Sequence, residues 1–236
     1  MSKIRLYLPS SCIKKLIEIE DSDYHKLRDV LRLKRGEIVY IFDGQGKEFI
    51  FAVEEVKSKK IILRMLQLTR EEKEVSLKIT LCFPLMRENK IDFILQKATE
   101  LGVNCFIPFF SQRCLIKDSF NREKRWERII KEATQQSERL WLPKLEKVKS
   151  FSQILSLDSE IKLFTTFQGE WLKDLSFNRE KKVIVVVGPE GDFSPSEIDK
   201  LKENNYRGIK LSVNLLRVET AAVFAVGLIS YKFYEG

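Results

Sequence analysis

The chain has 236 residues, of which 44% are apolar, so it is long enough for one large domain or two smaller ones. No apolar run reaches membrane-spanning length, and four scattered cysteines with a single histidine argue against a zinc site or a disulfide framework. The 42 basic and 34 acidic residues give a net charge of +8, which fits a charged surface as well as a nucleic-acid partner. We expect a cytoplasmic protein, because the N-terminus has no apolar segment typical of a signal peptide.

The first part of the chain has the composition of a small β domain. β-Branched and aromatic residues are dense enough to predict strands over 4–8, 37–42, 48–56 and 60–68. A turn at 42–46 joins two of these strands as a hairpin. One helix is predicted over 23–33, with Tyr24, Leu27 and Leu31 on one face. Short strands around one helix predict a small β-barrel.

A charged segment, 69–75, separates these strands from a second half with a different pattern. Strands and helices alternate there, with strands over 76–85, 103–110, 161–167, 182–188 and 208–213, and helices over 91–101, 121–137, from 194 onward and over 218–233. Apolar strands without alternation are typical of sheets covered on both faces. The pattern predicts an α/β domain with a mostly parallel sheet, and we divide the chain into domains 1–72 and 73–236.

Two loops in this second half are candidate sites. Gly188–Gly191 follows a buried strand, and Ser194, Pro195 and Glu197 after it form a helix-capping box. Taken alone, this turn is better explained as a plain strand-to-helix connection. Residues 215–222 also lead from a strand into a helix. Since ligands bind at the carboxyl ends of parallel strands, two such loops in one sheet favour a shared cleft.

The motifs Gly-Pro-Glu-Gly at 188–191 and Leu-Leu-Arg-x-Glu-Thr-Ala at 215–221 together are similar to those of the trefoil-knot (SPOUT) methyltransferases. The chain resembles most closely the RsmE family of 16S ribosomal RNA uracil-N3 methyltransferases, with further matches around His25, 42–44, 97–103, 111–114 and 132–139. The resemblance implies a PUA-like β-barrel followed by a knotted domain that binds S-adenosyl-L-methionine. It also implies a homodimer through the C-terminal domain, 16S rRNA of the small ribosomal subunit as partner, and no metal.

The chain departs from the family pattern at several positions. The family usually has Gly-Pro-Glu-Gly-Gly, whereas Asp192 stands at the fifth position here, and Asn214 replaces an arginine. Gln135 and Glu138 differ from a usual Glu-Gln-(Ser/Cys)-Gly-Arg motif. The first two departures bear on the cofactor pocket and the last two on contacts with RNA.

Methylation at uracil N3 requires that the N3 proton leaves and that charge growing on the flanking carbonyl oxygens is stabilised. Arg217 is the first candidate for this stabilisation and Arg139 the second. Glu219 is a candidate base or a helix-terminal carboxylate, and for Glu190 we favour a structural role. We expect cofactor contacts from Phe167, Gly188, Pro189, Glu190, Gly191, Leu211, Val213, Leu215, Leu216 and Thr220. We expect RNA contacts from His25, Arg28, Arg32, Lys34 and Arg113.

Two other functions are compatible with the sequence. One is a knot methyltransferase that acts on transfer RNA, and the other is a non-catalytic RNA-binding or ribosome-assembly factor whose cofactor pocket has drifted. Cofactor titration separates the last function from the first two.

Overall fold

A computed structural model describes residues 3–112, 122–175 and 182–233. The chain forms two compact units, one of residues 1–74 with 134–142, the other of residues 75–133 with 143–236. Segment 134–142, which was predicted to belong to the second domain, packs with the first unit instead. The domain boundary at 72/73 stays a prediction.

The first unit contains a five-stranded sheet. Its strands follow the order β1 (Arg5–Tyr7), β3 (Ile38–Phe42), β4 (Lys47–Val56), β5 (Ile61–Glu71) and β2 (Leu16–Ile19). β1 pairs with β3 in parallel, and the remaining neighbours are antiparallel. The alternating apolar residues of these strands form one core, in which Val39, Ile41, Phe51 and Leu63 have no exposed surface.

The prediction of a single α-helix over 23–33 is wrong in the bounds and in the type of helix. After a short 3-10 turn, η1 (Ser10–Cys12), the chain makes one α-helical turn, α1 (Asp21–His25), and then a π-helical turn, η2 (Lys26–Val30). Arg32 has φ 53°, so the helix cannot continue through it. The wider π turn shifts the buried face, so that Leu33 is buried and Leu31, predicted to face inward, is 41% exposed.

Segment 134–142 is bound to the rest of the first unit through the buried guanidinium of Arg5. Arg5 Nε donates to Glu48 Oε1 at 2.7 Å, and both side chains are almost fully buried. The other nitrogens of Arg5 donate to the carbonyl oxygens of Gln135 at 2.8 Å and Arg139 at 3.3 Å. The main chain of Leu142 donates to the hairpin carbonyl of Gly44 at 3.1 Å. The segment therefore completes this unit.

The second unit is built on a parallel sheet, as predicted. Its strands follow the order β12 (Arg207–Lys210), β10 (Ile161–Trp171), β11 (Lys182–Val186), β6 (Lys78–Pro84), β7 (Cys105–Phe110) and β8 (Lys144–Leu145), with β9 (Lys149–Ser150) also beside β7. All of these pairs are parallel. Residues Val183–Val186 are buried, as expected for a strand covered on both faces.

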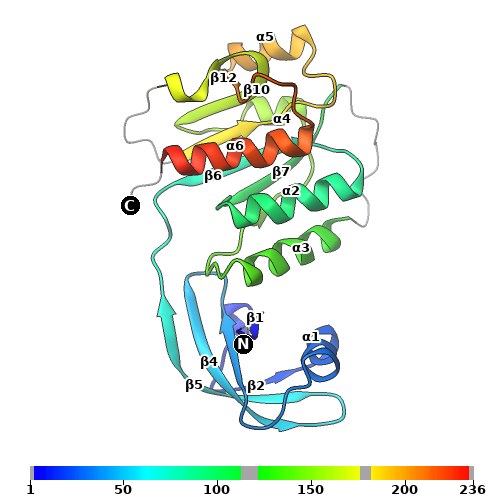
Figure 1. Cartoon of the computed structure of the whole chain (residues 1–236), viewed down its shortest axis with the longest axis vertical. Coiled ribbons are helices and arrows are strands. Elements are labelled where there is room, and N and C mark those ends of the chain that lie inside the picture. Colours follow the sequence, from blue (N-terminus) through cyan, green and yellow to red (C-terminus); the bar gives the residue numbers. More distant parts are fainter. Residues whose placement is uncertain (1–2, 113–121, 176–181, 234–236) are drawn as a thin grey trace. The chain divides into compact units, whose positions relative to one another are not determined.

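Helices cover both faces of this sheet. The helices are α2 (Glu88–Glu100), α3 (Glu123–Gln136), α4 (Phe151–Leu155), α5 (Pro195–Glu203) and α6 (Val218–Lys232), with a 3-10 turn, η3 (Leu172–Asp174). α2 and α6 lie side by side (Figure 1). Ile154 of α4 and Leu201 of α5 pack on the other face with Cys82, Ile184 and Val186. α3 begins in the second unit, and its last residues belong to the first.

Candidate functional site

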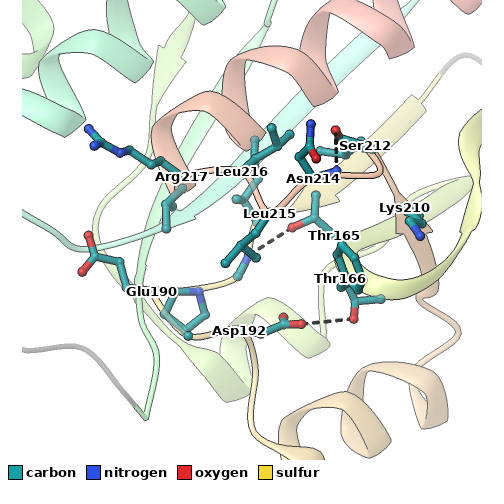
Figure 2. Close-up of a pocket in the computed structure, with 18 of the residues that line it drawn as sticks. Thr165, Thr166, Glu190, Asp192, Lys210, Ser212, Asn214, Leu215, Leu216 and Arg217 are labelled. Atoms are coloured by element: carbon teal, nitrogen blue, oxygen red, sulfur yellow. Dashed lines mark hydrogen bonds between the residues drawn. The ribbon is translucent and has the colours of Figure 1, made fainter.

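The carboxyl ends of β10, β11 and β12 enclose a pocket of about 580 Å³. One wall is the turn after β11, and the other is the loop after β12 that leads into α6 (Figure 2). Both loops were singled out from the sequence, and they share one pocket, as parallel strand ends do. The volume is in the range of about 300–1,000 Å³ that is usual for small-molecule sites.

The turn after β11 is fixed to the neighbouring strand β10. Gly188 N donates to Thr165 Oγ1 at 3.3 Å, and Thr166 Oγ1 donates to Asp192 Oδ2 at 3.2 Å (Figure 2). Asp192 N donates to Pro189 O at 3.0 Å, which closes the turn. The turn is therefore held by main-chain and side-chain bonds at both of its ends.

Asp192 occupies a backbone conformation that favours glycine. Its φ is 64°, and that of Gly191 is 84°. This left-handed geometry explains why the family motif usually carries glycine here. Aspartate tolerates it because its carboxylate bonds locally, and Phe193 N donates to Asp192 Oδ1 at 2.8 Å. The departure from the motif thus keeps the turn and adds a link to Thr166.

The helix that follows the turn begins as predicted. Ser194 is the N-cap of α5, Pro195 takes the first helical position, and Glu197 completes the capping box. Glu197 also accepts a hydrogen bond from Gln112 N at 3.1 Å.

The loop after β12 forms an apolar wall. Leu211, Leu215 and Leu216 line the pocket, and Leu215 is 87% exposed. Val213 and Thr220, two predicted cofactor contacts, are exposed and lie outside the lining. Main-chain groups of this loop and of 188–191 border the same space, an arrangement that suits an adenosine held by apolar contact and main-chain hydrogen bonds.

Charged side chains gather at the two ends of the pocket. Figure 2 shows Arg217 and Glu190 at one end and Lys210 at the other. Lys210 Nζ lies 4.5 Å from the centre of the Phe167 ring, which also lines the pocket. Arg217 is exposed and forms no ion pair within the described ranges of the chain.

Lys90, from the first turn of α2, is the residue that connects the carboxylates at the Arg217 end. Its ammonium is hydrogen-bonded to Glu190, and its Nζ lies 3.7 Å from Glu219 Oε2. The hydrogen bond to Glu190 raises the pKa of Lys90, and the ammonium in turn lowers the pKa of Glu190. Both groups are therefore charged at neutral pH.

Glu219 differs from Glu190 in its exposure. The side chain of Glu190 is 67% exposed, whereas that of Glu219 is 15% exposed. Glu219 Oε2 is buried and has no hydrogen-bond partner among the residues that the structure describes. Glu219 is not among the lining residues, so of the predicted catalytic residues only Arg217 borders the pocket directly.

The remaining predicted residues lie elsewhere. Arg139 belongs to the first unit, where burial lowers its pKa to about 10, so it stays protonated at neutral pH. His25 is paired with Asp29 at 3.0 Å, and Arg28 donates to Tyr24 and Ser58. The exposed Arg32 and Lys34 form no ion pair with any residue in the described part of the first unit. Arg113 lies outside the described residues.

Sequence reasoning missed Lys90, Lys210 and the two threonines of β10. Lys210 is the last residue of β12, whereas the two threonines lie within β10 and Lys90 lies in the first turn of α2, so the rule that identified the two loops could have found Lys210 alone. No metal-binding group of histidine, cysteine or acidic residues occurs within residues 3–112, 122–175 and 182–233. No helix in those same ranges is long and apolar enough to cross a membrane.

Comparisons with known proteins bear on both units. A family described as RNA methyltransferase domain matches residues 73–230, and one described as RNA methyltransferase PUA domain matches residues 19–66. The chain is 28% identical over 234 residues to ribosomal RNA small subunit methyltransferase E of Bacillus subtilis, covering 91% of this chain and 89% of that protein. It is 29% identical over 231 residues to the Synechocystis protein of the same name, covering 94% and 75%.

A solved structure is similar over nearly the whole chain. Ribosomal RNA small subunit methyltransferase E from Neisseria gonorrhoeae, bound to S-adenosyl methionine, aligns with a TM-score of 0.90 and 27% identity, covering 98% of each chain. The similarity extends over the PUA-like unit and the parallel α/β unit alike.

Proposed function

The chain belongs to the RNA methyltransferase domain family, and from this premise we propose that it transfers a methyl group from S-adenosyl-L-methionine to N3 of one uridine in 16S ribosomal RNA. The observation that carries the proposal is the pocket between the two strand-end loops. Its turn at 188–191 is tight, with positive φ at Gly191 and at Asp192, although Asp192 stands where the family motif has a glycine. This intact turn disfavours the alternative of a drifted, non-catalytic pocket.

The residues that line the pocket fit the proposed cofactor. Apolar side chains from 211–216 provide a surface for the adenine ring, and the main chain of both loops borders the pocket where its polar edge would lie. When bound, S-adenosyl-L-methionine supplies the electrophilic methyl group. Lys210 and Phe167 border one end of the pocket, and Arg217 borders the other end beside Glu190 (Figure 2).

Arg217 is the proposed donor to the negative charge that develops on the uracil. Its guanidinium is exposed and unpaired within the described residues, so it is free to donate to a carbonyl oxygen of the base. Glu219 does not border the pocket, so we assign it the role of holding cations rather than touching the base. Arg139, the second candidate donor, belongs to the first unit and is not among the residues that line the pocket.

RNA binding is proposed for the first unit. Arg32 and Lys34 are its best-placed cations, because His25 and Arg28 already bond to neighbouring residues. A match to an RNA methyltransferase PUA domain over residues 19–66 supports this assignment.

We also propose a cytoplasmic homodimer that pairs through α2 and α6. These adjacent helices leave Phe93 and Phe224 more than 40% exposed and Tyr231 86% exposed. Covering such an apolar face with a second copy is favourable. Light scattering should give twice the monomer mass, and Phe224→Glu should reduce it to the monomer value. The proposed knot in the second unit follows from the family alone.

Methyl transfer to small ribosomal subunits that lack the modification tests the function. We expect one methyl group per 16S rRNA, mapped by mass spectrometry to N3 of a single uridine. Arg217→Ala should keep cofactor affinity and lower the transfer rate by about a hundred- to a thousand-fold. Arg207→Ala, which removes an exposed arginine at the start of β12, is the matched control. Methylation of transfer RNA instead would contradict the assignment of the substrate.

A further inference from the structure

Among the described residues, Lys90 is the lysine that lines the pocket beside Glu190, and no sequence motif identified it. We propose that Lys90 is a further catalytic residue, which with Arg217 forms a two-cation site for the ionised uracil ring. Glu219 is its positioning residue. The inference rests on the proposed function, since it concerns how N3 of uracil becomes nucleophilic.

The chemistry of the base calls for two cations. When N3 loses its proton, the negative charge spreads over O2 and O4, which flank N3 on opposite sides. One donor bonds to one of these oxygens only. Two oriented cations, one for each oxygen, stabilise the anion more than either does alone. Arg217, the N-cap of α6, and Lys90 of α2 both line the pocket, and both act electrostatically on Glu190.

The contacts of Lys90 show how it is held. Glu219 Oε2 lies 3.7 Å from its ammonium and accepts no hydrogen bond from the described residues, so it acts as a fixed buried countercharge. Glu190 bonds to the same ammonium from an exposed, easily displaced side chain. Arg87 and Arg217 are the other cations that act on Glu190. Glu190 thus occupies the place that an anionic substrate would take.

The proposed step exchanges one anion for another. As uracil enters, it displaces the exposed Glu190 carboxylate from Lys90, and N3 gives its proton to water, so an N–H bond breaks and an O–H bond forms. Lys90 then bonds to the uracil anion. The N3 electron pair then forms a bond to the methyl carbon while the carbon–sulfur bond breaks, and that electron pair stays on the sulfur.

The test compares Lys90→Met, which removes the charge and keeps the length, with Lys90→Arg, which keeps the charge. Lys90→Met should lower single-turnover methyl transfer to small subunits by about a hundred- to a thousand-fold. The rate of this variant should also rise more steeply with pH than the wild-type rate. Without the ammonium of Lys90, the uracil anion forms only as the pH of the solution rises. Lys90→Arg should restore most of the rate, and calorimetric affinity for S-adenosyl-L-methionine should change less than about threefold in both variants.

A nucleobase with a more acidic N3 proton distinguishes charge stabilisation by Lys90 from a purely structural role. In subunits reconstituted from RNA that contains 5-fluorouridine, Lys90→Met should regain rate relative to the wild type. Fluorine resonances of such RNA, bound without cofactor, should show ionisation of the target at lower pH with the wild type than with Lys90→Met. Lys144→Met is the control, because Lys144 also bonds to a glutamate but does not line the pocket.

Two results are to be distinguished. If the wild type methylates no ribosomal RNA, the proposed function fails. If the wild type is active but Lys90→Met matches it, or if fluorination rescues nothing, the role of Lys90 is overturned and the function stands.

Discussion

Replacing Arg5 by methionine should destabilise the first unit more than any surface substitution. Arg5 lies in β1, and its side chain is 3% exposed. It bonds to Glu48, whose side chain is fully buried, and to three main-chain carbonyl oxygens of segment 134–142. Methionine has similar length and apolar bulk but provides none of these donors.

The magnitude follows from what the substitution leaves behind. Without Arg5, the nearest cation to the buried Glu48 carboxylate is Arg70, at 3.9 Å. Removing one partner of a buried ion pair costs about 3–5 kcal/mol, because the other charge stays buried without compensation. Replacing both partners by apolar residues is often neutral. The double variant Arg5→Met with Glu48→Met should therefore recover most of the lost stability.

Hydrogen–deuterium exchange measures this effect in the first unit alone. Peptides from β3 and β4 should exchange about two to four orders of magnitude faster in Arg5→Met than in the wild type, and those from β11 should not change. The double variant should return toward wild-type rates. The reasoning is refuted if the single variant loses less than about 1 kcal/mol or if the double variant is no more stable than the single one.

Three further predictions concern individual residues. Thr166→Val removes the bond to Asp192 and should weaken S-adenosyl-L-methionine binding about two- to tenfold by calorimetry, whereas Thr166→Ser should not; equal affinities would contradict the role of this bond. Glu138 has φ 57°, so Glu138→Gly should raise the urea-measured stability by about 1 kcal/mol, and Glu138→Ala, which keeps the strain, should not. The exposed Cys12 should react with a thiol reagent at pH 8 in the folded protein. Burial raises the pKa of Cys105 to about 11 and that of Cys82 further, so these two cysteines should react only on unfolding. A fast reaction that persists in a variant lacking both Cys12 and Cys114 would count against this.

Local patterns in the sequence predicted much of the second unit. The apolar strand around Val183–Val186, the buried face of α2 and the capping box at Ser194 each depend on residues close in sequence. The π turn at Lys26–Val30 changed the buried face of the first helix, and no propensity predicts such a turn.

Both loops of the candidate site were predicted from the sequence, but several of its charged residues were not. The turn at 188–191 and Arg217 were identified by their position after a strand, because the carboxyl ends of parallel strands lie together at one edge of the sheet. Lys90 looked like an ordinary charge at a helix start, since its partners Glu190 and Glu219 are far away in sequence. The positive φ of Asp192 likewise became visible only in three dimensions.

The dependence of the first unit on segment 134–142 has a consequence for synthesis on the ribosome. The first 74 residues are synthesised early. The main-chain partners of Arg5 and Gly44 lie in segment 134–142, which ends at Leu142, 68 residues after Glu74. At about 5–20 residues per second, this interval lasts about 3 to 14 seconds. During that time the nascent β domain holds Arg5 and Glu48 without the main-chain acceptors that enclose them. We therefore expect the N-terminal unit to reach its final fold only seconds after its last strand has been made.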